Sequence, residues 1–192
     1  MWRINGRMAI LNFYSQNGED EWIANNLVLP EKGFYLDVGC GHPFNQSNTA
    51  FLRERGWKGL AVDANPSWTN HWTEELREHF MHGVVSNRRE IVRFDIHAVP
   101  EYSRINENGA LRYMSVTLGE IIGDRSVDFM SLDVEGHEFE VITGMDSLKL
   151  PPVIVSEYNT AGIGEDFSVR DYLSYLGFQV VHKTISNLIF LK

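Results

Sequence analysis

Ionisable side chains gather in the stretch SLDVEGHEFEV, residues 131–141. Asp133 stands at the end of an apolar, strand-like run, and Glu135 and His137 follow in the expected turn. A carboxylate or an imidazole at such a position can hold a cationic ligand or take a proton from a substrate hydroxyl. Asp133 and His137 are competing candidates for the general base, and Glu135 is a third catalytic candidate. A surface position at the start of a helix is the alternative for His137.

Glu157 follows the next strand-like run, PVIVSEY at 152–158. The carboxyl ends of neighbouring parallel strands meet at one edge of a sheet, so Asp133 and Glu157 are expected to lie close together. The two carboxylates could hold one hard cation such as Mg²⁺, but the spacing does not require a metal. We therefore expect Glu157 to bind the acceptor, with a metal at Asp133 and Glu157 as the alternative.

A glycine turn follows the first strand-like run, in FYLDVGCGHPFNQSNT at 34–49. Gly39 and Gly41 suggest a nucleotide site, but a dinucleotide turn needs a third small residue where this chain has Phe44. Asp37 would also place a carboxylate beside the diphosphate, and like charges in a pocket are costly. S-adenosylmethionine has no phosphate and carries a sulfonium and an ammonium group. The turn therefore favours S-adenosylmethionine over a dinucleotide.

Polar residues after other elements extend this cofactor site. Asp63, at the end of KGLAVD, is the candidate for the ribose diol, and its neighbour Ala64 belongs to the same site. Ser86 and Asn87 follow the third strand, where the adenine should lie; an ordinary polar turn is the alternative. Gln16 is expected in an N-terminal lid over the cofactor, with a capped surface helix as the alternative.

Strand-like and helix-like segments alternate along the chain. This alternation predicts a doubly wound, Rossmann-like α/β fold, whose mostly parallel sheet carries helices on both faces and binds ligands at the carboxyl ends of its strands. The last two strands are close enough for an antiparallel hairpin. Strands are expected at 34–38, 58–63, 81–85, 91–96, 127–133, 152–158 and twice within 178–192, and the main helices at 18–28, 47–55, 67–80, 137–145 and 168–177.

Length and composition limit the class of protein. The chain has 192 residues, 43% of them hydrophobic, which is enough for one core, so we expect a single catalytic domain over 1–192 with an arm and helix at 1–30. The net charge of -9 argues against a nucleic-acid partner. No apolar run is long enough for a membrane span, and the start lacks the pattern of a signal peptide. With one cysteine, Cys40, we expect a cytoplasmic protein.

Three blocks carry a resemblance to a known family: SQNGEDEWI, FYLDVGCGHPFNQSNTAFLRERGWKGLAVDANP and SLDVEGHEFEVI. In this order and spacing the chain resembles the FkbM-type S-adenosylmethionine-dependent methyltransferases from about residue 15 to 158. The resemblance implies a seven-strand sheet whose last strand is antiparallel, and O-methylation of polyketides, sugars and other glycan or lipid-linked acceptors. Because the chain is short, we expect no added acceptor-binding domain.

The function expected from these observations is methyl transfer from S-adenosylmethionine to a hydroxyl of a small molecule, sugar, glycan or polyketide-like acceptor. Residues 97–115 and 159–167 are expected to shape the acceptor pocket. Two alternatives remain. One is an NAD(P)-dependent oxidoreductase on a related sheet, and the other is a non-catalytic module that binds the cofactor. The sequence does not predict the oligomeric state.

Overall fold

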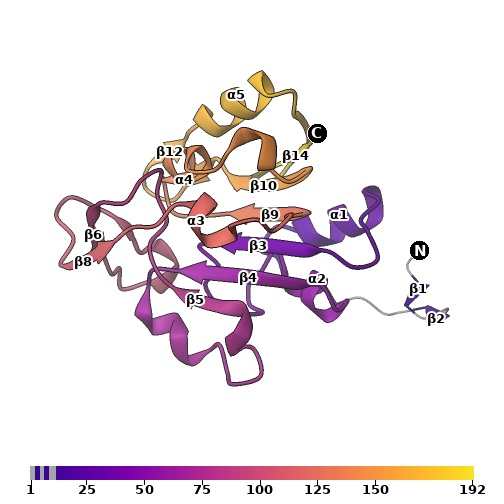
Figure 1. Ribbon diagram of the computed structural model, residues 1–192, viewed down its shortest axis with the longest axis horizontal. Helices are drawn as coiled ribbons and strands as arrows, with labels where there is room; N and C mark the ends of the chain where they lie inside the picture. The colour runs from indigo at the N-terminus through magenta and orange to yellow at the C-terminus, as the bar shows by residue number, and fades with distance from the viewer. Residues whose placement is uncertain (1–2, 5–6, 9–11) are drawn as a thin grey trace.

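A seven-stranded sheet forms the centre of the computed structural model, which describes residues 3–4, 7–8 and 12–192 (Figure 1). The strand order is β13-β14-β10-β9-β3-β4-β5, and β14 runs antiparallel to both of its neighbours, whereas the other pairs are parallel. The predicted fold class and terminal hairpin are therefore confirmed. The strands are β3 Phe34–Val38, β4 Lys58–Asp63, β5 Phe80–His82, β9 Phe129–Leu132, β10 Val153–Glu157, β13 Gln179–Lys183 and β14 Asn187–Leu191.

Helices cover both faces of this sheet. Residues of α1 and α2 pack with Tyr35 and Phe129, while residues of α3, α4 and α5 pack with Leu36, Val38 and Met130. Side chains of a strand alternate between the two faces, so adjacent residues of β3 contact different helix layers. The helices are α1 Glu19–Asn26, α2 Ala50–Glu54, α3 Leu118–Ile122, α4 Glu138–Thr143 and α5 Ser168–Tyr175. None of the helices in the described part of the chain is long and apolar enough to cross a membrane.

The segment 67–80 differs from the predicted helix. Two short 3₁₀ turns, η1 Pro66–Asn70 and η2 Arg77–His79, stand in its place before Phe80 begins β5. The expected apolar stripe is nevertheless packed, because Trp72 is buried, stacks on Phe80 at 5.1 Å between ring centroids and donates its indole N–H to the carbonyl of Gly41 at 3.0 Å. Tertiary contacts to the glycine turn thus replace a regular helix.

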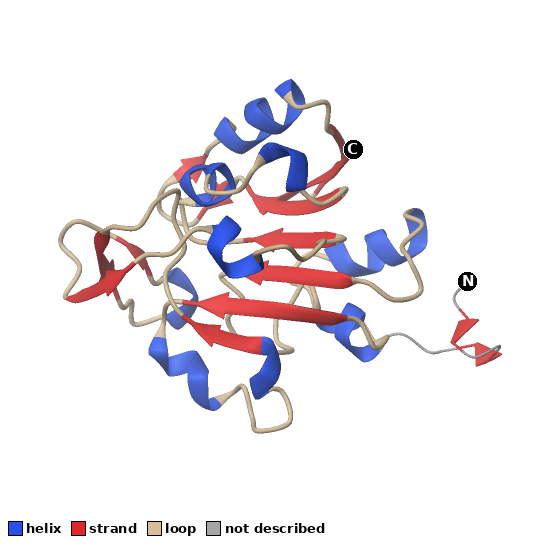
Figure 2. Cartoon of the chain, viewed as in Figure 1, coloured by secondary structure: helices blue, strands red, loops and turns tan. Residues whose placement is uncertain are grey.

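A small antiparallel sheet lies beyond the carboxyl ends of the central strands (Figure 2). Its middle strand β6 Ile91–Asp95 was predicted at 91–96, whereas β7 Arg104–Ile105 and β8 Leu111–Met114 lie in a region expected to be loop. The small sheet thus stands next to the edge where ligands bind in α/β proteins. The remaining short elements are β1 Arg3–Ile4, β2 Arg7–Met8, η3 Pro100–Tyr102, η4 Ser147–Lys149, β11 Asn159–Thr160 and β12 Gly164–Glu165.

Candidate active site

A cavity of about 520 Å³ opens where β3, β4, β9 and β10 end. This volume is within the range of about 300 to 1,000 Å³ that is usual for small-ligand pockets. Of the twelve predicted site residues, nine line the cavity and three do not. The lining residues are Gln16, Gly39, Gly41, Asp63, Ala64, Asp133, Glu135, His137 and Glu157. The other three, Asp37, Ser86 and Asn87, are not among the lining residues.

The glycine turn after β3 is forced by a close approach of two chain segments. Gly39 has φ 79°, a left-handed value that L side chains rarely adopt, and a Cβ there would lie 1.6 Å from the carbonyl oxygen of Asp133. Gly41, with φ 53°, donates its N–H to Oδ2 of Asp63 at 2.9 Å. The turn therefore brings the ends of β3, β4 and β9 together at the cavity.

Asp63 is held at the end of β4 by backbone donors. Its Oδ1 accepts the N–H of Asn65 at 2.7 Å, in addition to the bond from Gly41. Burial raises the pKa of Asp63 to about 6, and the N–H groups of Asn65 and Gly41 oppose this shift. Asp63 thus combines a structural role with a position in the cavity wall, where the ribose role stays a prediction.

Asp37 lies below the turn and is not one of the described residues that line the cavity. It is only 4% exposed, and Oδ2 accepts the hydroxyl of Thr49 at 2.6 Å. Burial raises its pKa to about 6. Asp37 shares a strand face with Tyr35, on the side of α1 and α2, so the structure shows a bond to the segment before α2 and no direct position in the cavity.

The third strand ends earlier than expected, which changes the adenine end of the site. Because β5 stops at His82, the cavity is lined by Val84 and Val85, and the predicted Ser86 and Asn87 are displaced from it. Asn87 is exposed. Ser86 is buried, and its hydroxyl lies 3.0 Å from Nε2 of His137.

His137 is engaged through both ring nitrogens. Nε2 faces the Ser86 hydroxyl at 3.0 Å, and Nδ1 lies 3.6 Å from Oε2 of Glu140. Burial lowers the pKa of His137, which favours the neutral ring. To accept a substrate proton, this imidazole must give up one of the two contacts. The geometry therefore favours the carboxylates as proton acceptors.

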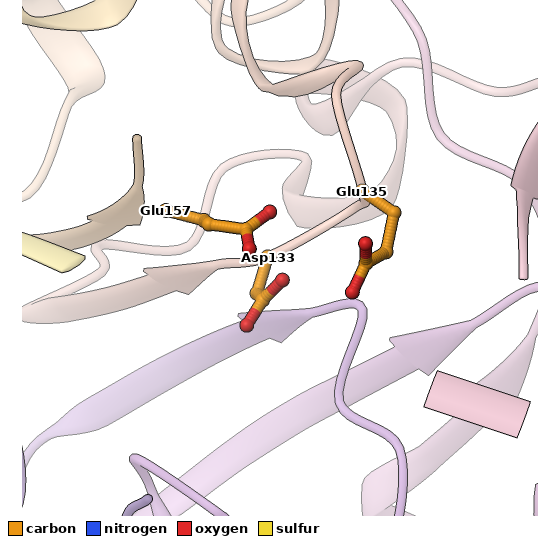
Figure 3. A group of neighbouring side chains, drawn as sticks. All are labelled: Asp133, Glu135 and Glu157. Carbon is orange, nitrogen blue, oxygen red and sulfur yellow. The ribbon is translucent and has the colours of Figure 1, made fainter. Parts of the chain in front are cut away.

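Asp133, Glu135 and Glu157 form a carboxylate cluster in the cavity wall (Figure 3). One oxygen from each lies within 4.8 Å of the others. Glu157 is 7% exposed, and its Oε2 accepts the hydroxyl of Thr160 at 2.8 Å. Glu135 has φ 59°, and its Oε2 is buried without a hydrogen-bond partner among the described residues. This buried oxygen of Glu135 is therefore available to a ligand, a proton or a cation.

Mutual repulsion and burial keep this cluster from ionising fully at neutral pH. Burial, followed by the charge of Glu157, raises the pKa of Asp133 well above its ordinary value. Burial is also the main reason why the pKa values of Glu135 and Glu157 both rise to about 8. A cationic ligand would relieve this repulsion, and the same three oxygens could serve as ligands for a divalent metal.

The rim of the cavity comes from segments that surround the strand ends. Gln16 lines it, and the preceding Ser15 is bridged to Gln46 and bonded to the buried Asp20. A lid at 1–30 stays a prediction, and residues 1–2, 5–6 and 9–11 of that arm lie outside the described part of the chain. Val99, Tyr102 and other residues of 97–115 and 159–167 also line the cavity, and their role in an acceptor pocket stays a prediction.

The charge of the lining suits a cation. Glu101 adds a carboxylate to Asp63 and the cluster, and neither lysine nor arginine occurs among the described lining residues. A pyrophosphate would meet repulsion here, whereas a sulfonium or an ammonium group would be attracted. The donor set therefore fits S-adenosylmethionine.

Comparison with known proteins gives a family and a fold. The family model of the methyltransferase FkbM domain matches residues 37–180. The chain is similar to the structure of a TehB-like SAM-dependent methyltransferase from Corynebacterium glutamicum, with 14% identity, a TM-score of 0.50 and coverage of 93% of this chain and 88% of that one. It is also similar to a proposed rRNA methylase from Clostridium thermocellum, with 12% identity, a TM-score of 0.50 and coverage of 95% and 97%. At such low identity these likenesses show the fold alone. Comparison with curated proteins finds no match.

Proposed function

Because the chain belongs to the FkbM methyltransferase family and is an S-adenosylmethionine-dependent methyltransferase, we propose that it methylates a hydroxyl group of a small molecule, sugar, glycan or polyketide-like acceptor. The observation that carries this proposal is the carboxylate cluster in the cavity wall. An alcohol must lose its proton as the oxygen is methylated, so the site needs a proton acceptor next to the acceptor oxygen.

The cofactor half of the cavity is formed by the turn after β3 and the end of β4. Bound S-adenosylmethionine supplies an electrophilic methyl group on a positively charged sulfur. We assign the ribose to Asp63 and Ala64, the adenine to the apolar wall of Val84 and Val85, and the rim to Gln16. The carboxylates attract the positive charge and orient it toward the acceptor half of the cavity.

Within the cluster, we assign the general base to Glu135. Its buried Oε2 has no hydrogen-bond partner among the described residues, whereas Oε2 of Glu157 accepts a hydroxyl from Thr160. A carboxyl group whose pKa lies near 8 is a stronger base than an ordinary one, and it can still ionise near neutral pH. Asp133 and Glu157 then hold the acceptor hydroxyl, and its proton passes to Glu135 as the oxygen is methylated.

A divalent metal is the alternative use of the same oxygens, since carboxylates are ligands for Mg²⁺. The proposal assigns proton acceptance to the protein itself. We therefore expect EDTA to leave methyl transfer unchanged. Loss of activity with EDTA, restored by Mg²⁺, would assign the cluster to a metal.

The cofactor assignment is tested by calorimetric titration with S-adenosylmethionine, S-adenosylhomocysteine and NAD. We expect both adenosyl ligands to bind and NAD not to bind, with Asp63→Ala weakening both. NAD binding alone would favour the oxidoreductase alternative. Binding without transfer to any alcohol would favour a non-catalytic module.

The base assignment is tested by Glu135→Gln in a radiolabelled methyl-transfer assay over a panel of alcohols and glycosides. We expect turnover to fall about 100-fold or more, with little change in the affinity for S-adenosylhomocysteine. Asp124→Asn, at an exposed carboxylate after α3, is the control and should keep full activity. Full activity of Glu135→Gln would reject this base.

A further inference from the structure

A second hollow, of about 330 Å³, adjoins the main cavity. Tyr102 and Ala161 line both, so the two spaces share a wall. The second hollow lies between the small sheet and the loop after β11, outside the region assigned to the cofactor. Its lining consists of Asp95, His97, Tyr102, Arg104, Ala161 and Gly162.

The small sheet places a carboxylate and a guanidinium side by side in this hollow. Asp95 of β6 and Arg104 of β7 are directly paired in the antiparallel register. Oppositely charged neighbours at such positions often pair, yet no ion pair or hydrogen bond of either side chain is found within the described part of the chain. An acceptor group and a donor group are therefore both available to a ligand.

An oriented imidazole and an aromatic ring complete the lining. Nδ1 of His97 lies 3.0 Å from the N–H of Val99 and 3.3 Å from the carbonyl oxygen of the same residue. In the tautomer that makes the shorter contact, Nδ1 accepts this N–H, and Nε2 carries the proton and can donate. The ring of His97 lies 5.6 Å from that of Tyr102, which is 42% exposed at the junction of the two spaces. Tyr102 thus offers a ring surface between groups that donate and accept hydrogen bonds.

This combination selects among ligand classes. An anion would be attracted by Arg104 but repelled by Asp95, and an apolar chain would desolvate both charges without replacing their hydrogen bonds. A neutral polyhydroxylated ring satisfies all of the lining groups. Its hydroxyls donate to the carboxylate and accept from the guanidinium and the imidazole, and its C–H face packs on Tyr102.

We propose that the second hollow is a subsite for a neutral sugar ring of the acceptor, next to the ring or group whose hydroxyl is methylated. This inference rests on the proposed function, because the shared wall makes the hollow an extension of the methyl-transfer cavity. It narrows the acceptor to a glycan or glycoside.

The test is a glycan microarray with neutral, sulfated and sialylated members, incubated with fluorescently labelled protein with and without S-adenosylhomocysteine. Neutral glycans should bind, and Asp95→Asn and Arg104→Gln should each weaken their binding about tenfold, the usual loss for a hydrogen bond to a charged group. Asp124→Asn and Arg112→Gln, at exposed positions outside the hollow, are the controls and should bind as the wild type does.

Calorimetry with S-adenosylhomocysteine separates this proposal from the proposed function. All four variants should keep the affinity of the wild type for this ligand. The subsite is rejected if no neutral glycan binds, if anionic glycans bind more tightly, or if Asp95→Asn and Arg104→Gln bind like the controls. Failure of S-adenosylhomocysteine to bind the wild type would instead reject the cofactor assignment, and the array without that ligand would still decide the subsite.

Discussion

The main cavity has two walls that are built in different ways. The wall at the strand ends is fixed by backbone bonds: the N–H of Gly39 donates to the carbonyl of Val62 at 2.8 Å, and that of Asp133 to Val38 at 2.9 Å. The opposite wall presents side chains of the segment that joins β6 and β7 of the small sheet, such as the exposed Val99 and Tyr102. The backbone of the fold thus builds the wall proposed for the cofactor, whereas side chains beside the small sheet build the wall proposed for the acceptor.

The largest effect should come from breaking the strand-end wall with Gly39→Ala. The new Cβ would clash with the carbonyl of Asp133, and we expect a loss of about 3 kcal/mol or more in the free energy of unfolding, measured with urea. Gly56→Ala is a matched control, because Gly56 has φ 80° and no atom within 4 Å of its Cβ position. That variant should lose only about 1 kcal/mol. Equal losses would show that the close approach is not essential.

The next effect concerns activity against pH. If the cluster supplies the base, kcat/KM should rise with pH toward a plateau above about 8, because burial and the charge of Asp133 raise the pKa of Glu135 to that value. Below it, activity should fall about tenfold per pH unit as the base becomes protonated. Glu135→Gln should abolish this dependence. If the residual kcat/KM of Glu135→Gln keeps the same pH profile, a group other than Glu135 causes the fall at low pH.

The free energy of unfolding should fall as pH rises, whereas activity should rise, because Glu157 lies in the same wall of the cavity. The pKa of Glu157 in the fold is raised from 4.5 to about 8, so this carboxyl favours the fold at low pH and that contribution is lost as pH rises from about 4.5 to 8. Glu157→Gln, which cannot ionise, should gain about 2 kcal/mol over the wild type at pH 8.5 and little at pH 5. Glu120→Gln is the control of opposite sign, because the N–H of Thr117 and Arg89 lower the pKa of Glu120. A gain independent of pH would contradict this account.

The smallest effect links the two walls. Burial dominates the raised pKa of Glu135, and Arg104 of the small sheet partly offsets it. Arg104→Gln should therefore raise, by a fraction of a pH unit, the pH at which kcat/KM begins to fall. Arg112→Gln, on the exposed side of the same sheet, should leave that pH unchanged. Identical profiles for the two variants would show that the walls are electrostatically independent.

Much of the strand-end wall could be predicted because its residues follow apolar runs. Gly39, Gly41, Asp63, Asp133 and Glu157 each stand at the end of a strand or in the turn after it, and all line the cavity. The period of two within a strand, together with the layer of α1 and α2, could also have indicated that Asp37 faces away from the ligand edge.

Other residues could not be placed by local patterns. The length of β5 decides that Val84 and Val85, and not Ser86, line the cavity, and strand ends are the least certain part of a pattern. The apolar spacing of 67–80 indicates a helix, but contacts of Trp72 with Gly41 and Phe80 override it. The carboxyl group of Glu135 joined the other two only through a left-handed backbone position in a turn.

The sequence by itself determined the alternating α/β order, the glycine turn and the carboxylates at the strand ends, because these depend on residues that are near one another in the chain. Only the tertiary structure decided which side chains share the cavity, how strongly burial raises their pKa values, and that Asp95, Arg104 and Tyr102 face a second hollow. Those properties depend on packing between segments that are distant in sequence, and no local periodicity encodes them.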